Sequence, residues 1–97
     1  MALPDIIQPI VRRAILDLLH DTGGQQNDDV IARMLNGLGH RVARRDVATE
    51  MRWLAEQKLI ATEEVGPFLV AEIEPDGLDV SLGNLKLDGV HIHRTGR

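Results

Sequence analysis

The stretch HRVARRDVATEMRWLAEQKLI, residues 40 to 60, decides the fold. Its apolar residues Val47, Met51 and Leu54 recur at the three-and-four spacing of one helical face, which predicts an amphipathic helix ending near Gln57. Its arginines fall outside that apolar stripe. A helix that is apolar on one side and rich in arginine on the other is typical of proteins that read DNA, but it is also typical of ordinary solvated helices.

Two further helices are predicted upstream of this stretch. Apolar residues at helical spacing predict a first helix over about 6 to 20, and Pro9 fits its first turn because the nitrogens there make no intrahelical bond. The glycine-containing segment 21 to 26 is predicted to be a loop. A second helix is predicted over about 28 to 38, with Asn27 as its N-cap.

The downstream half predicts a hairpin and a short helix. Two runs of strand-forming residues, 59 to 65 and 68 to 73, are separated by the breaker pair Gly66 and Pro67, so they predict a tight hairpin. Residues 74 to 82 then fit a fourth helix with a proline at its first position. Three helices, a hairpin and another helix predict an α+β winged helix-turn-helix fold.

The domain is expected to span residues 1–83, followed by a C-terminal segment over 84–97. In that segment Asp88 and Gly89 suit a two-residue turn, and Leu87 would then oppose Val90 across a second hairpin. An isolated hairpin of this size is marginal, and chain ends fray unless they are tied down. The segment is therefore predicted to be either a hairpin or an extended tail, and a tail of this kind would suit a dimer contact.

The charge is unevenly distributed along the 97 residues, whose formal net charge is -4. Residues 40–58 carry five Lys or Arg against three acidic residues, whereas 59–82 carry six acidic residues and no Lys or Arg. The absence of cysteine excludes disulfides and thiolate metal sites. No apolar run approaches the length of a membrane span, so a cytoplasmic protein without a membrane partner is expected.

Part of the sequence resembles known DNA-binding domains. The pattern V-x3-M-x2-L-x4-L-I, which runs from Val47 to Ile60, resembles the recognition helix and following strand of bacterial ArsR-like and MarR-like domains. That resemblance implies a winged helix.

A resemblance over nearly the whole chain is carried by GHRVARRDVATEMRWLAEQKLI, EEVG, GLDVSLG and DGV. These stretches are similar to small winged-helix proteins of Mu-like transposable phages and prophages, a family of largely undefined function. The chain departs from the family pattern at Lys58, where glycine is common, and at Ala43, where a serine or threonine cap is expected. The resemblance implies a phage protein acting in the cytoplasm of a bacterial host.

The exposed face of the third helix supplies the candidate DNA-binding residues. A recognition helix presents its N-terminal residues to base edges, and flanking cations hold phosphates. Arginine pairs with guanine, threonine contacts the thymine methyl group, and an arginine preceding the helix can reach a phosphate. We therefore expect double-stranded DNA to be bound by a homodimer through Arg41, Arg44, Arg45, Thr49 and Arg52. Ala48 is expected on the same exposed face.

The acidic hairpin supports a different hypothesis. Glu63 and Glu64 precede its tip, and they would repel the phosphates that a wing normally contacts. The alternative function is a protein-interaction module that acts in phage assembly, DNA packaging or the binding of a host factor. Trp53 either covers the edge of the core or anchors such a partner. The sequence carries no recognisable catalytic constellation, and no enzymatic activity, cofactor or metal is expected.

Overall fold

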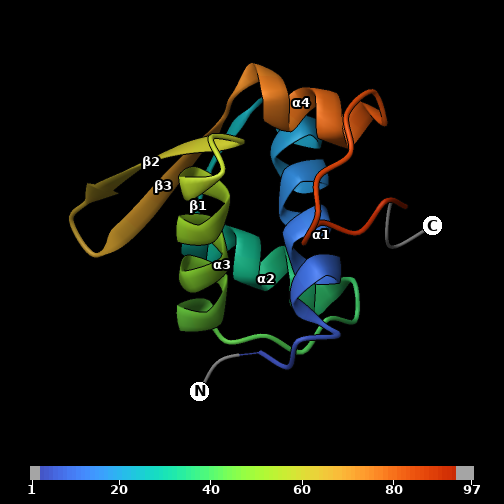
Figure 1. Cartoon of the computed structure of the whole chain (residues 1–97). Helices are drawn as coiled ribbons and strands as arrows, with labels where there is room; N and C mark the ends of the chain where they lie inside the picture. Colours follow the sequence, from blue (N-terminus) through green and yellow to red (C-terminus); the bar gives the residue numbers. More distant parts are fainter. Residues whose placement is uncertain (1–2, 94–97) are drawn as a thin grey trace.

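The computed structural model describes residues 3–93, and it contains four helices and a three-stranded antiparallel sheet (Figure 1). The elements are α1 (Gln8–Asp21), β1 (Gln25–Asn27), α2 (Asp28–Gly37), α3 (Arg44–Glu56), β2 (Ile60–Val65), β3 (Phe68–Ile73) and α4 (Pro75–Leu82). The strand order is β1-β3-β2, so β2 lies at one edge of the sheet. The predicted α+β class is confirmed.

The helices begin and end close to the predicted positions because the expected terminal residues act there. The side chain of Asn27 accepts a hydrogen bond from the backbone N–H of Val30 at 2.9 Å, which caps α2. Ala43 offers α3 no side-chain acceptor, and instead its own N–H donates to the Asp46 carboxylate at 3.3 Å. Gly83 ends α4 in the left-handed conformation, with φ of 84°.

The prediction of a loop through residue 26 is wrong at its end, because β1 begins at Gln25. This strand pairs with β3 in the register Gln25 with Glu72 and Asn27 with Val70. Just before it, the carbonyl oxygen of Gly24 accepts a hydrogen bond from the Ile73 N–H at 2.7 Å. Three polar residues carry no alternating pattern, and this strand exists because β3 supplies its backbone partners.

The core lies between the helices and the inner face of the sheet. In Figure 1, α4 lies across one end of α1, and α3 runs beside α1. Side chains that are fully buried on α1, α2 and α3 include Ile15, Leu16, Leu19, Leu35, Met51 and Leu54. Each such side chain contributes about 1.5–3 kcal/mol when it leaves water. The apolar stripe from which α3 was predicted therefore packs into the hydrophobic core.

The short segment between α3 and β2 has an unusual backbone conformation at Lys58 and packs closely against Gly77 of α4. Lys58 has a φ of 64°, a conformation that favours glycine. Gly77 lies inside α4, where a Cβ atom would come within 2.0 Å of the Leu59 carbonyl oxygen. Glycine inside a helix is unfavourable, and here it allows α4 to approach the chain leading into β2.

The C-terminal segment contains a turn and is held against α1. Residues 84–93 contain a turn but no strand, so the predicted hairpin does not form within them. The Val90 N–H donates to the Leu87 carbonyl, whereas the His91 N–H donates to the carbonyl of Pro9 at the start of α1. After its turn, the chain is therefore held at the start of α1 by a backbone hydrogen bond. Residues 94–97 of the predicted tail lie outside the described residues.

Candidate nucleic-acid interface

The structure places Arg44 between α2, α3 and the β2–β3 turn. Its Nε lies 3.1 Å from a carboxylate oxygen of Asp28, and its Nη2 donates to the Pro67 carbonyl. The guanidinium carbon lies 4.9 Å from the centre of the Phe68 ring, which adds a cation–π contact. Although its side chain is 38% exposed, Arg44 is held by three neighbours and fixes the hairpin tip against the start of α3.

Asp28 is the buried partner that organises this contact. One of its carboxylate oxygens faces Arg44, and the other accepts hydrogen bonds from the backbone N–H groups of Leu69 at 3.1 Å and Asp29 at 3.0 Å. The residue also lies at the N-terminus of α2, where the helix dipole stabilises negative charge. Its position at a helix start was the only sequence signal for this role, and nothing local in the sequence indicated the bond to β3.

Arg52 is exposed and pairs with the hairpin. Its Nη2 lies 3.5 Å from a carboxylate oxygen of Glu64 on β2. Both side chains are more than half exposed, and exposed ion pairs of this kind typically contribute less than about 1 kcal/mol. The pair links α3 to β2 without holding Arg52 firmly.

Arg41, Arg45 and Thr49 lie at the exposed N-terminal part of α3 and just before it. The Thr49 hydroxyl donates to the carbonyl of Arg45 one turn earlier at 3.0 Å, as threonine often does within a helix. Across residues 3–93, the guanidinium groups of Arg41 and Arg45 take part in no ion pair or hydrogen bond within the chain. The expected exposure of Ala48 is wrong: it is 8% exposed, because the packed face of α3 is wider than its apolar stripe.

Arg12 forms an ion pair that the sequence did not reveal. It lies on α1, where its Nε is 2.7 Å from a carboxylate oxygen of Glu50 on α3. The guanidinium also stacks 3.8 Å from the centre of the Trp53 ring and donates to the Gly89 carbonyl at 3.1 Å. Trp53 therefore covers the core edge, one of its two predicted roles, and it does so against the C-terminal segment.

Arg13 holds the same segment from the other side. Its Nε donates to Asp17 at 3.0 Å, and its two terminal nitrogens donate to the carbonyls of Ser81 at 2.9 Å and Ile92 at 3.0 Å. The side chains of Arg13 and Asp17 are only 6% and 5% exposed. Two neighbouring arginines on α1 thus fasten residues 84–93 to the helical core.

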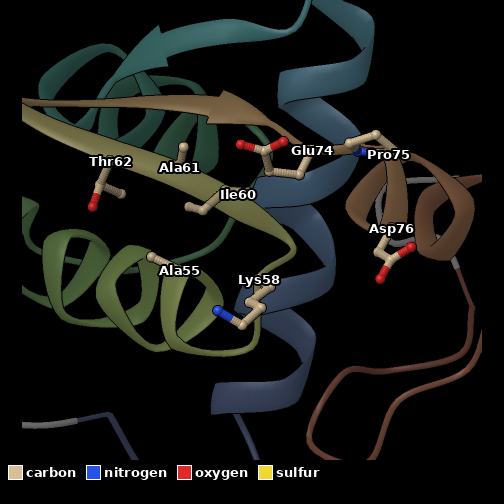
Figure 2. A pocket seen from close by; sticks show the side chains of 8 residues that line it. All are labelled: Ala55, Lys58, Ile60, Ala61, Thr62, Glu74, Pro75 and Asp76. Atoms are coloured by element: carbon tan, nitrogen blue, oxygen red, sulfur yellow. The ribbon is translucent and has the colours of Figure 1, made fainter.

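An open groove follows the seam between α3 and β2, and we call it the α3–β2 groove. One end, shown in Figure 2, has a volume of about 620 Å³ and is lined by Ala55, Lys58, Ile60, Ala61, Thr62, Glu74, Pro75 and Asp76. The other end, about 630 Å³, is lined by Arg52, Ala55, Glu56, Thr62, Glu64 and Leu69. Ala55 and Thr62 line both ends.

Within residues 3–93, no group of three histidine or carboxylate side chains is placed to hold a metal ion. His91 and His93 lie with ring centres 5.8 Å apart, in an edge-to-face arrangement that aromatic rings commonly adopt. None of the helices in the described part of the chain is both long and apolar enough to cross a membrane.

Two curated proteins resemble this chain over most of its length. An uncharacterized protein of Escherichia phage Mu, gp26, is 34% identical over 86 residues, which cover 89% of this chain and 90% of gp26. An uncharacterized protein of Haemophilus influenzae is 31% identical over 74 residues, or 75% of this chain and 72% of that protein. No protein-family model matches. The identity to gp26 over nearly both full lengths shows that the chain belongs to a family of Mu-like phage proteins that includes gp26.

Proposed function

We propose that this protein is a winged helix-turn-helix domain that binds double-stranded DNA as a homodimer in the cytoplasm of the bacterial host. The order α1-β1-α2-α3-β2-β3 and the strand order β1-β3-β2 support the winged-helix assignment. In that assignment α2 and α3 form the helix-turn-helix, and the hairpin of β2 and β3 is the wing.

The observation that carries the proposal is the exposure of Arg41 and Arg45 at the N-terminal end of α3, without partners in residues 3–93. The N-terminal part of a recognition helix is the part that reaches base edges. Arg45 and Thr49 are the base-contacting candidates, and Arg41 contacts a phosphate. Arg52 also contacts DNA, and breaking its exposed ion pair with Glu64 costs little free energy. Arg44 acts indirectly, because it fixes the hairpin tip beside the helix.

The charges of the wing are the reason for proposing two protomers. Glu63 and Glu64 repel phosphates, so α3 must provide the contacts alone. Each neutralised phosphate changes log K by about -0.9 per unit of log salt concentration, and a few arginines per protomer give weak binding. Two copies related by a two-fold axis double the contacts and present their helices about 34 Å apart, one turn of duplex.

The test is a fluorescence-anisotropy titration of duplexes tiled from the neighbouring phage genome, at two salt concentrations. Arg45→Ala is compared with Arg33→Ala, which removes an equally charged side chain that is 78% exposed on α2. We expect Arg45→Ala to weaken binding by about 1–3 kcal/mol for each half-site and to reduce the preference among the tiled duplexes, and Arg33→Ala to leave both unchanged. Failure of the wild-type chain to bind at low salt would exclude this function, and equal losses in both variants would exclude the assigned surface.

The second candidate function is a protein-interaction module acting in phage assembly, in DNA packaging or on a host factor. The specific observation in its favour is the neutralisation of Arg44 by Asp28 and of Arg52 by Glu64. Together with the acidic wing, these pairs reduce the positive field that DNA would meet. The surface formed by α3 and the β2–β3 hairpin is then better suited to a protein partner than to DNA.

A further inference from the structure

The outer edge of β2 is an unpaired strand edge. The backbone N–H of Leu69 points toward Asp28, and that of Ile73 points toward Gly24, so both are directed away from β2. In an antiparallel ladder, residues alternate between pairs that exchange hydrogen bonds and pairs that do not. Leu69 and Ile73 of β3 therefore belong to pairs that do not bond across the ladder.

The register identifies which residues of β2 face the open side. Glu64 is opposite Leu69 and Ile60 is opposite Ile73, with Thr62 midway between them. The backbone N–H and carbonyl groups of Thr62 and Glu64 are consequently directed outward, ready to pair with another strand. At the opposite edge of the sheet, β1 has only three residues, which makes it a far shorter template.

The α3–β2 groove lies beside this open edge and is lined by both charged and apolar side chains. Its walls carry the carboxylates of Glu56, Glu64, Glu74 and Asp76 against the cations of Arg52 and Lys58. Between these charges the floor is apolar, formed by Ala55, Ile60 and Leu69. An unpaired edge, an apolar floor and an excess of negative charge occur together along the same strand.

We propose that β2 accepts an extended, basic segment of a partner protein as a fourth strand of the sheet. The segment's backbone pairs with Thr62 and Glu64, its apolar side chains lie on the groove floor, and its lysines or arginines approach the carboxylates. Strand addition of this kind gains affinity from main-chain hydrogen bonds and specificity from alternate side chains. This proposal rests on the protein-interaction candidate and is independent of DNA binding.

A second copy of this chain fits the same edge poorly. Two β2 strands paired antiparallel, with Thr62 and Glu64 of one copy opposite Glu64 and Thr62 of the other, would place the two Glu63 side chains directly opposite each other. Like charges placed opposite each other on neighbouring strands are destabilising. A basic strand on this edge avoids that repulsion. Charge complementarity therefore favours a partner segment that carries lysines or arginines.

The experiment uses the full chain labelled with ¹⁵N and a synthetic peptide as long as β2, Lys-Thr-Val-Thr-Lys-Thr, whose lysines and valine lie on one face of the strand and therefore can all face the groove. The matched control peptide replaces each lysine with glutamate. We expect the lysine peptide to shift the amide signals of Thr62 and Glu64 and to slow their exchange with solvent, because both amides become hydrogen-bonded. The glutamate peptide is expected to leave both signals unchanged.

Two variants locate the contact on the edge. Thr62→Pro removes an outward N–H without breaking the ladder, since proline is tolerated on an edge where its nitrogen faces solvent. Glu64→Lys reverses a charge in the groove, and Glu63→Lys reverses one on the opposite face of the same strand. We expect Thr62→Pro and Glu64→Lys each to weaken peptide binding by about threefold or more, and Glu63→Lys to change it less.

Three results would overturn the proposal. The first is the absence of any shift in β2 at millimolar lysine peptide. The second is equal binding of the two peptides, which would show that charge does not select the occupant. The third is protection of Thr62 and Glu64 at high protein concentration without peptide, which would assign the edge to a second copy. Loss of DNA binding in the anisotropy titration leaves all three readouts unaffected, so the two proposals fail separately.

Discussion

Two pairs of neighbouring arginines, Arg12–Arg13 on α1 and Arg44–Arg45 on α3, look alike in the sequence and have different environments in the structure. Both guanidinium groups of the first pair are nearly buried and hold the C-terminal segment. In the second pair, Arg44 is held by Asp28 and Arg45 is exposed. The role of an arginine is therefore set by the acids and carbonyls that the fold brings to it.

The difference has an energetic consequence. A buried carboxylate that loses its cation keeps the cost of its own desolvation, whereas an exposed arginine can be removed with little effect. Glu50 is 2% exposed, and its ion pair with Arg12 offsets the cost of burying its charge. The free energy of unfolding therefore depends on Arg12. Substitutions in the two pairs should accordingly separate fold stability from surface function.

The largest effect is expected for Arg12→Met. This variant leaves Glu50 buried without its cation and removes the contact with Trp53, so we expect a loss of about 3–5 kcal/mol in the free energy of unfolding. Urea denaturation followed by the fluorescence of the one tryptophan measures it. The double variant Arg12→Met/Glu50→Met should recover most of the loss, because no isolated charge remains. A loss below about 1 kcal/mol in the single variant would contradict the importance of this pair.

The next effect is expected where the C-terminal segment meets Arg12. Gly89 has a φ of 94°, and a Cβ atom there would lie 2.9 Å from two carbons of the Trp53 ring. We expect Gly89→Ala to cost about 2–3 kcal/mol, from backbone strain together with displacement of the ring. Gly39→Ala is the matched control, because Gly39 has a φ of 95° and open space around its Cβ position. Equal losses in the two variants would show that the segment does not press on Trp53.

Most of the fold was predictable because it rests on local signals. Helical periodicity, the Asn27 cap and the Gly66–Pro67 turn each act within a few residues, and the corresponding elements are present. The strand β1 and the path of residues 84–93 were not predictable in the same way. They depend on the Ile73 N–H and on the arginines of α1, which lie far away in the sequence.

The candidate site was predictable only as a set of residues on one helix. Periodicity placed Arg45, Thr49 and Arg52 off the apolar stripe of α3, and all three are exposed. It could not show that Asp28 holds Arg44 or that Glu64 reaches Arg52, because these acids come from other elements. The distinction between an available arginine and a neutralised one is a property of tertiary structure.

A smaller effect is expected for Arg44→Met. The variant removes the bonds to Asp28 and the Pro67 carbonyl, but Asp28 keeps its two backbone N–H donors. We expect a loss of about 1–2 kcal/mol in the free energy of unfolding. Hydrogen exchange should quicken in the β2–β3 turn more than in α1, because the turn loses its tie to α3. Unchanged exchange in the turn would show that Arg44 does not position the wing.

The smallest effect on stability is expected for Arg45→Ala. Arg45 is exposed and its side chain makes no ion pair or hydrogen bond with residues 3–93, so the free energy of unfolding should change by less than about 0.5 kcal/mol. The substitution also replaces an arginine in the first turn of α3, where positive charge opposes the helix dipole, with the best helix former, which offsets any loss of packing by its stem. Urea denaturation of Arg45→Ala and Arg44→Met under the same conditions compares the contributions of the two neighbouring arginines to the free energy of unfolding. A loss as large as that of Arg44→Met would mean that Arg45 supports the fold, and its weaker DNA binding in a titration would then no longer identify a contact with DNA.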